Sequence, residues 1–243
     1  MGIIIGLGSG RSGTLSLSKL INHQNESICF HEINPSCMKW SGSEGTVISM
    51  INEFETIISG GDRNLLTIDY SVSDHSLQIE KFKSMDKVTC IGEIGFYYLN
   101  YVEDILTKNP NVKFPCIKRD KNSTIQSYSA KMISNQKRSK LNRLLKIDLK
   151  RNHFMNHNGK QWLHDRIWDK CFPKFEASSL EEAIGLYWEH YYQEAEVLAE
   201  KFPQVKIFDL NELNTPEGQK SLLNFCGYDN PSLLTVHENK KLE

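Results

Sequence analysis

A glycine-rich segment near the N-terminus combines hydroxyl, guanidinium and flexible backbone groups in a pattern suited to binding an anion. Residues 6–17 read Gly-Leu-Gly-Ser-Gly-Arg-Ser-Gly-Thr-Leu-Ser-Leu and lie between an apolar run, residues 3–5, and a helix-compatible stretch. Successive backbone N–H groups of such a turn can point inward together, and a helix N-terminus adds partial positive charge. Arg11 adds a full charge, and Ser12 and Thr14 add hydroxyl donors. The segment therefore predicts a cradle for phosphate or sulfate.

This loop can also be compared with a Walker A loop, a dinucleotide-binding loop and a glycine turn without a ligand. A Walker A loop requires GxxxxGK[ST], but Arg11 stands in place of the Lys and Ile5 in place of the first Gly. Residues 8–13 satisfy the dinucleotide pattern GxGxxG, and Glu32 follows at a spacing suited to binding a ribose. An NAD(P)-dependent oxidoreductase is therefore the main alternative. A glycine turn without a ligand does not account for the arginine and the two hydroxyls.

A second segment carries a strand-end arginine followed by a hydroxyl at a fixed spacing. Residues 112–128 read Val-Lys-Phe-Pro-Cys-Ile-Lys-Arg-Asp-Lys-Asn-Ser-Thr-Ile-Gln-Ser-Tyr, so Ser127 stands eight residues after Arg119. An arginine at the end of a strand can bind a phosphate in bidentate fashion, and a hydroxyl from the following helix can complete its shell. Neither a dehydrogenase nor a nucleoside triphosphatase requires this second segment.

Taken in order, the two segments resemble those of the sulfotransferase family. The first is similar to the family's 5′-phosphosulfate loop and the second to its 3′-phosphate segment. The resemblance implies a three-layer α/β fold with a mainly parallel sheet, related to P-loop nucleotide kinases. It also implies the cofactor 3′-phosphoadenosine 5′-phosphosulfate, with 3′-phosphoadenosine 5′-phosphate as product. The implied cofactor-binding residues are Gly8, Ser9, Gly10, Arg11, Ser12, Gly13, Thr14, Leu15, Arg119 and Ser127.

Sulfuryl transfer to a hydroxyl also needs a general base, for which the sequence offers several carboxylates and histidines. Glu32 is the preferred base and His31 the alternative, because both follow a predicted strand whose end faces the glycine-rich loop. We assign Arg11 to the leaving-group oxygens. The resemblance supports a glutamate, which the family uses in its carbohydrate-sulfating branches. Three further candidates for contact with the acceptor are Asp69, His75 and Glu93.

Strands and helices alternate through most of the chain. Strands are predicted at residues 3–5, 27–30, 65–68, 88–91, 112–117 and 205–208. Helices are predicted at residues 12–22, 47–59, 74–83, 96–108, 181–202 and 216–226. This alternation implies crossover connections and a mainly parallel sheet. With no repeat or low-complexity linker, residues 1–243 are expected to form one domain, with a helical excursion over 122–180 that shapes the acceptor pocket.

Apolar and aromatic residues recur at helical spacing within residues 181–202. We interpret this stripe as part of the core, because an aromatic stripe of this period usually marks a buried helix face. Its members are Ile184, Tyr187, Trp188, Tyr191, Ala195 and Leu198.

Charge is balanced over the whole chain but not along it. The 243 residues carry 29 Lys and Arg against 30 Asp and Glu, which excludes a wholly basic nucleic-acid binder. Residues 113–151 nevertheless hold twelve Lys or Arg and two Asp. A nucleic-acid-binding module is a second alternative, but Phe114 and Tyr128 are the only aromatics there to stack on bases. The resemblance instead implies that part of this stretch binds the cofactor or an anionic acceptor.

From its cysteines, histidines and apolar runs, we expect the protein to be a cytoplasmic enzyme without a metal or a membrane span. The six cysteines form no CxxC pair, and His153, His157 and His164 lack a metal-ligand spacing. No apolar run approaches the roughly 18 residues of a spanning helix, and no signal peptide is evident. We expect a sulfotransferase acting on an acceptor hydroxyl, on a carbohydrate or glycolipid-like molecule rather than a phenol.

Overall fold

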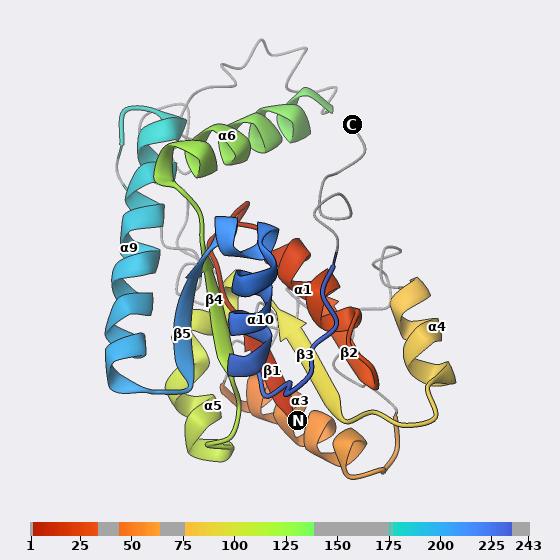
Figure 1. Cartoon of the computed structure of the whole chain (residues 1–243). Helices are drawn as coiled ribbons and strands as arrows, with labels where there is room; N and C mark the ends of the chain where they lie inside the picture. Colours follow the sequence, from red (N-terminus) through yellow and green to blue (C-terminus); the bar gives the residue numbers. More distant parts are fainter. Residues whose placement is uncertain (1, 34–43, 64–75, 139–174, 176, 235–243) are drawn as a thin grey trace.

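The computed structural model describes residues 2–33, 44–63, 76–138, 175 and 177–234 (Figure 1). The strands within these ranges are β1 (Ile3–Gly6), β2 (Ser27–His31), β3 (Cys90–Ile94), β4 (Phe114–Lys118) and β5 (Val205–Asp209). β3 pairs in parallel with β1 and β2, and β4 pairs in parallel with β5. Parallel bridges from Ile4 to Lys113 and from Leu7 to Cys116 join the two groups. The strand order is therefore β2-β3-β1-β4-β5.

The strands form because short apolar runs can be buried on both faces of a parallel sheet. Every residue of β1 and β3 is buried. Ile3 and Ile5 pack on one side of the sheet, and Ile4 packs on the other. This alternation gives the molecule two hydrophobic clusters, one on each face of the sheet.

Helices cover both faces. α1 (Thr14–Asn22) and α10 (Pro216–Phe225) pack against one face, with the short 3₁₀ helix η3 (Leu210–Asn214) between β5 and α10. The other face is covered by α3 (Glu44–Ile58), η2 (Phe96–Tyr101), α5 (Val102–Lys108) and α9 (Leu180–Lys201). The expected α/β class, a three-layer sandwich with a parallel sheet, is confirmed.

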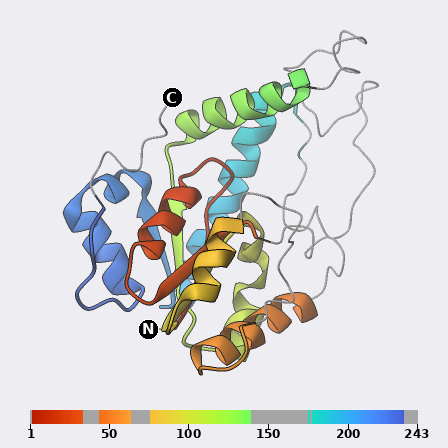
Figure 2. The same cartoon turned by 90° about the vertical axis from the view of Figure 1, so that its right-hand side faces the viewer.

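Two helices lie at the margins of this sandwich. α4 (Ser76–Ser84) packs beside the edge strand β2. α6 (Lys121–Arg138) packs on α9 and crosses above the carboxyl ends of the strands (Figures 1 and 2). α6 therefore overhangs the edge of the sheet where ligands of α/β proteins bind.

The predicted elements match those observed, with two qualifications. Residues 96–108 were expected to be one helix but form η2 followed by α5, so that prediction was wrong in its first half. The predicted strand at residues 65–68 and most of the excursion over 122–180 lie outside the described residues. The four cysteines that the structure describes are buried and free. Among the described helices, none combines the length and apolarity of a membrane span.

Candidate active site

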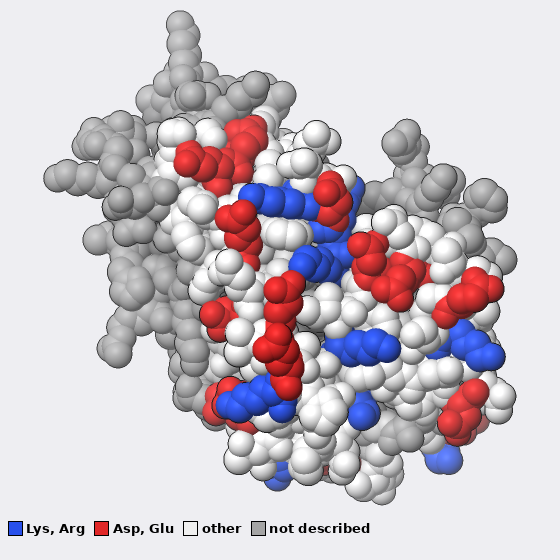
Figure 3. Space-filling view, turned by 60° about the vertical axis from the view of Figure 1, so that its left-hand side comes forward, with Lys and Arg blue, Asp and Glu red and all other residues white. Residues whose placement is uncertain are grey.

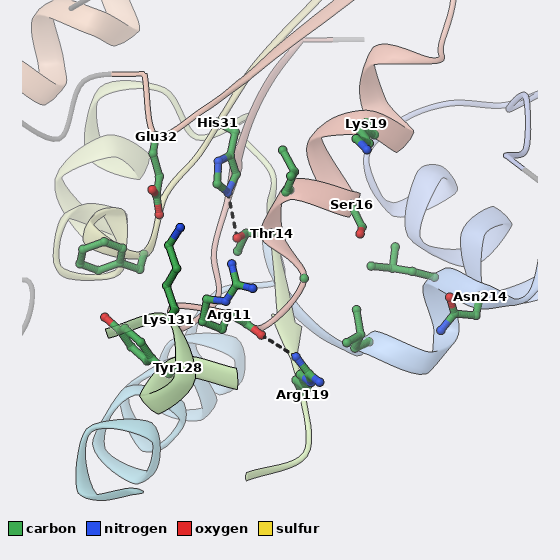
Figure 4. A pocket seen from close by; sticks show the side chains of 16 residues that line it. Arg11, Thr14, Ser16, Lys19, His31, Glu32, Arg119, Tyr128, Lys131 and Asn214 are labelled. Atoms are coloured by element: carbon green, nitrogen blue, oxygen red, sulfur yellow. Dashed lines mark hydrogen bonds between the residues drawn. The ribbon is translucent and has the colours of Figure 1, made fainter. Parts of the chain in front are cut away.

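A cavity of about 710 Å³ opens at the carboxyl edge of the sheet, between the glycine-rich loop, α6 and η3 (Figure 4). The loop after β1 forms its floor, and the ends of β2 and β4 supply side chains at its walls. Parallel strands deliver the residues that follow them to one edge, so segments remote in sequence meet here.

The floor of the cavity has the properties of an anion cradle. Gly8 has φ 152° and Gly13 has φ 104°, angles that side-chain-bearing residues rarely adopt. A Cβ at Gly8 would lie 2.9 Å from the carbonyl oxygen of Ile117, so only glycine fits. Helix α1 begins after Gly13 without a side-chain cap. Within the described chain, the N–H groups of Gly13, Thr14 and Leu15 donate to no acceptor, which leaves them available to a phosphate or sulfate.

Arg11 stands in this floor in a left-handed conformation with φ 70°, which is uncommon outside glycine. Its Nε donates to Oγ of Ser127, 3.2 Å away on α6. Its carbonyl oxygen accepts a hydrogen bond from Nη1 of Arg119, also at 3.2 Å. Arg119 follows β4, so the two predicted phosphate-binding segments are in direct contact.

Helix α9 holds the loop from behind through aromatic side chains. Oη of Tyr191 accepts from the N–H of Gly8 at 3.0 Å, and Oη of Tyr192 lies 3.4 Å from the N of Ser9 and donates to Ile117 O at 2.7 Å. Nε1 of Trp188 donates to the carbonyl oxygen of Arg119 at 3.0 Å. Five of the six predicted stripe residues on α9 are buried and Trp188 is half-buried, and the polar ends of the aromatic side chains also position both predicted phosphate-binding segments. Tyrosine and tryptophan in place of leucine were the available signal, since buried Tyr and Trp usually find a polar partner.

His31 and Glu32 face the same cavity from the end of β2. Nε2 of His31 hydrogen-bonds Oγ1 of Thr14 at 2.9 Å, which ties the imidazole to the loop. Glu32 has a left-handed φ of 51°, and its N–H donates to Ile94 O at 2.9 Å. Burial raises the pKa of the Glu32 carboxyl, and the positive charge of Arg11 partly opposes that rise. β3 separates β2 from β1, so Glu32 faces the loop across one strand.

Glu93, another candidate for contact with the acceptor, lies in β3 behind this turn. It is fully buried and does not line the cavity. Its Oε1 accepts from the N–H of Ile33 and from the hydroxyl of Tyr97, each at 3.0 Å. Burial raises the pKa of Glu93 to about 8, so the carboxyl is largely protonated at neutral pH. Glu93 thus holds the residue that follows Glu32.

Comparison with known proteins identifies the family. A family model described as a sulfotransferase domain matches residues 3–243. The chain belongs to the sulfotransferase family. No curated protein sequence matches it. Among solved structures, it is similar to a sulfotransferase from Alicyclobacillus acidocaldarius, with 14% identity, a TM-score of 0.47, and coverage of 96% of this chain and 84% of that one.

The structure brings many of the predicted residues of this sulfotransferase into one cavity. The predicted residues that line it are Gly10, Arg11, Gly13, Thr14, Leu15, His31, Glu32 and Arg119. Five predicted residues are described by the structure but do not line the cavity: Gly8, Ser9, Ser12, Ser127 and Glu93. Ser12 is fully buried, so its side-chain hydroxyl does not face the cavity. Its backbone N–H donates to Ser9 O. Asp69 and His75 lie outside the described residues.

Several lining residues of the sulfotransferase were not predicted from the sequence. They are Ser16, Lys19, Phe96, Tyr128, Lys131, Leu210, Leu213 and Asn214. Helical spacing offered a signal for one of them, because Lys131 stands four residues after Ser127 and so on the same face of α6. The residues of η3 had no such signal, since their place depends on the packing of α10 and β5.

The basic side chains of residues 113–151 that the structure describes include some that pair with acidic residues on α9 and some that line the cavity. Lys118 and Lys121 pair with Glu196 and Glu189 of α9, each at 2.7 Å. On the side of the molecule that carries α9, basic and acidic side chains are interleaved (Figure 3). Arg119 and Lys131 instead line the cavity. Part of the positive charge is therefore neutralised on the surface, and part is directed at the site.

Proposed function

We propose that this sulfotransferase takes its sulfuryl group from 3′-phosphoadenosine 5′-phosphosulfate and transfers it to a hydroxyl of an acceptor. The observation that carries the proposal is the hydrogen bond from Arg119 to the carbonyl oxygen of Arg11. It joins an uncapped helix N-terminus, suited to one anionic group, to a strand-end guanidinium, suited to a second. A nucleotide with phosphates on both the 5′ and the 3′ positions matches this pair.

The residues divide between the two anionic groups. The N–H groups of Gly13, Thr14 and Leu15 would hold the 5′-phosphosulfate at the N-terminus of α1. Arg119 would bind the 3′-phosphate through its guanidinium. Ser127 accepts from Arg11 beside the cavity without lining it, so its own hydroxyl proton would reach that phosphate once the side chain turns toward the cavity.

The nucleoside would lie at the η3 end of the cavity. Leu210 and Leu213 offer apolar surface there, and Asn214 offers an amide that can both donate and accept hydrogen bonds. A flat base with polar edges suits this combination, because cofactor sites are mostly apolar with a few polar groups that fix orientation.

When bound, the nucleotide supplies an activated sulfuryl group. We assign Glu32 as the general base that removes the proton of the attacking hydroxyl, because its raised pKa brings its basicity nearer to neutral pH. Arg11 would neutralise negative charge on the leaving oxygen. His31 is the alternative base, although its Nε2 is already hydrogen-bonded to Thr14.

The acceptor would lie at the Glu32 end, where Phe96 and Tyr128 line the wall. A carbohydrate or glycolipid-like molecule suits this end, because a flat aromatic wall can pack against a sugar ring while a carboxylate binds its hydroxyls. We also propose a cytoplasmic location, because the buried, free thiols of the described cysteines suit a reducing compartment.

Calorimetric titration with 3′-phosphoadenosine 5′-phosphate tests the proposal, with NADH, NADPH and ATP as comparison ligands. We expect the bisphosphate to bind and the other three to bind far more weakly. Binding of NADH or NADPH in preference to the bisphosphate would contradict the proposal and favour a dinucleotide at the GxGxxG loop.

A further inference from the structure

The cavity has two chemically different ends on either side of the glycine-rich loop (Figure 4). Ser16, Lys19 and Asn214 lie at one end, and Glu32, Tyr128 and Lys131 lie at the other. If the nucleotide occupies the first end, as the proposed function requires, the second end receives the acceptor. The side chains at that second end therefore determine which acceptors bind.

Lys131 is a cation at this acceptor end. It lies on α6 one turn after Ser127, and its side chain extends toward the space between Glu32 and Arg11 (Figure 4). Among the described residues, no carboxylate pairs with Lys131, whereas Lys118 and Lys121 are each paired with a glutamate of α9. Lys131 is exposed, and its side chain stands at the open edge of the cavity.

Lys131 lies at the end of the cavity away from Lys19 and Arg119 (Figure 4). Arg11 and Arg119 contact each other and the loop, where the two phosphate-bearing groups would bind. Lys131 adds a positive charge on the far side of Arg11, next to Glu32. With a neutral acceptor, Glu32 is the one carboxylate among the described lining residues that Lys131 could face, whereas an acceptor with an anionic group would add a partner of its own.

The two aromatic residues at the wall of the acceptor end make contacts with the rest of the fold. The ring of Tyr128 packs on the loop so closely that a Cβ at Gly10 would lie 2.9 Å from it. The carbonyl oxygen of Phe96 accepts from the hydroxyl of Tyr191 at 3.1 Å. A ring packed on this wall would lie at the same end of the cavity as Glu32 and Lys131.

We propose that the acceptor is an anionic carbohydrate, and that Lys131 binds its carboxylate or phosphate while Glu32 takes the proton of a nearby hydroxyl. This inference rests on the proposed function, and it adds the charge of the acceptor and the residue that selects for it. Lys131 is a specificity-determining residue here, and it has no part in the proton transfer.

Matched acceptor pairs test this inference, with kcat/KM measured from a labelled sulfuryl donor. The pairs are glucuronic acid with glucose, galacturonic acid with galactose, and glucose 6-phosphate with glucose. We expect kcat/KM to be higher for the acidic member by about tenfold or more, because a hydrogen bond to a charged group contributes about that much to binding. In Lys131→Gln the acidic-to-neutral ratio should fall toward one, and in Lys131→Arg it should be largely kept.

Lys220→Gln on α10 is the matched control, because it removes the same charge from an exposed position outside the cavity. The preference ratio should be unchanged in that variant. The carboxylate and phosphate pairs distinguish the two sources of negative charge.

Three results would overturn the inference. The first is equal use of both members, or preference for the neutral one, by the unmodified enzyme. The second is an unchanged ratio in Lys131→Gln, which would show that Lys131 does not select the acceptor. The third is no transfer to any acidic member although 3′-phosphoadenosine 5′-phosphate binds normally. Loss of that nucleotide binding itself would instead remove the proposed function.

Discussion

Nη1 of Arg119 donates a hydrogen bond to the carbonyl oxygen of Arg11 across 3.2 Å, although 108 residues separate them in the sequence. The contact forms because Arg11 follows β1 and Arg119 follows β4, and these strands are neighbours bridged between Leu7 and Cys116. The backbone of one predicted phosphate-binding segment is therefore held by the side chain of the other. A change at Arg119 would act on both.

Replacement of Glu32 tests the assignment of the general base. Glu32→Gln should bind the nucleotide nearly as well as the unmodified protein and transfer the sulfuryl group about 10²–10⁴-fold more slowly. Because the base acts in its ionised form, the rate should rise with pH. Because burial raises its pKa, this rise should lie above the ordinary carboxyl value of 4.5.

The comparison for this prediction is His31→Gln, measured for both binding and turnover over the same pH range. An unmodified rate in Glu32→Gln, together with a large loss in His31→Gln, would transfer the role of base to His31.

Tyr192→Phe tests whether α9 positions the glycine-rich loop. The change removes the hydroxyl that lies 3.4 Å from the N of Ser9 and donates to Ile117 O. It should lower the free energy of unfolding by about 1–3 kcal/mol and also weaken nucleotide binding. Denaturant unfolding and calorimetry measure the two effects.

Tyr228→Phe is the matched control for that prediction. Its hydroxyl donates to Oγ of Ser27 at 2.9 Å, at the opposite end of β2 from the site. It should lose stability without losing nucleotide affinity. Equal nucleotide affinity in Tyr192→Phe and the unmodified protein would show that the tyrosine only stabilises the core.

Glu93 makes the stability of the protein depend on pH. Its pKa is about 8 in the folded protein against an ordinary value of 4.5, so the folded state binds this proton more tightly than the unfolded chain does. The free energy of unfolding should therefore fall as the pH rises from 4.5 to 8, by at most about 1.4 kcal/mol per pH unit from this group.

Urea unfolding at several pH values measures this slope, and Glu93→Gln should reduce it. The amide can still accept from Ile33 and Tyr97, but its own N–H groups would be buried, so some loss of stability is expected at every pH. An identical slope in both proteins would assign the titration to another group.

The sequence was sufficient to predict the α/β class, the order of the elements and the two segments that meet at the cavity, whose binding of phosphate stays a prediction. These depend on local signals, namely apolar runs, helix spacing, and glycine beside arginine and hydroxyls. The same signals predicted that Arg11, Glu32 and Arg119 would face one cavity, because parallel strands end at one edge.

Features that depend on packing between distant segments could not be predicted in this way. Spacing within α9 predicted that Tyr191 is buried, but not that its hydroxyl reaches Gly8 or that the hydroxyl of Tyr192 reaches Ser9. Nor could spacing show that Glu93 lies behind the turn after β2, because that depends on β3 lying next to β2.

The most direct test of the two-segment site compares the affinities for 3′-phosphoadenosine 5′-phosphate and for adenosine 5′-monophosphate, which lacks the 3′-phosphate. In the unmodified protein the bisphosphate should bind about 10–100-fold more tightly, the range expected for charge-assisted hydrogen bonds. In Arg119→Ala that difference should largely disappear. Equal affinity for the two nucleotides in the unmodified protein, or a difference that Arg119→Ala leaves intact, would contradict this account of the site.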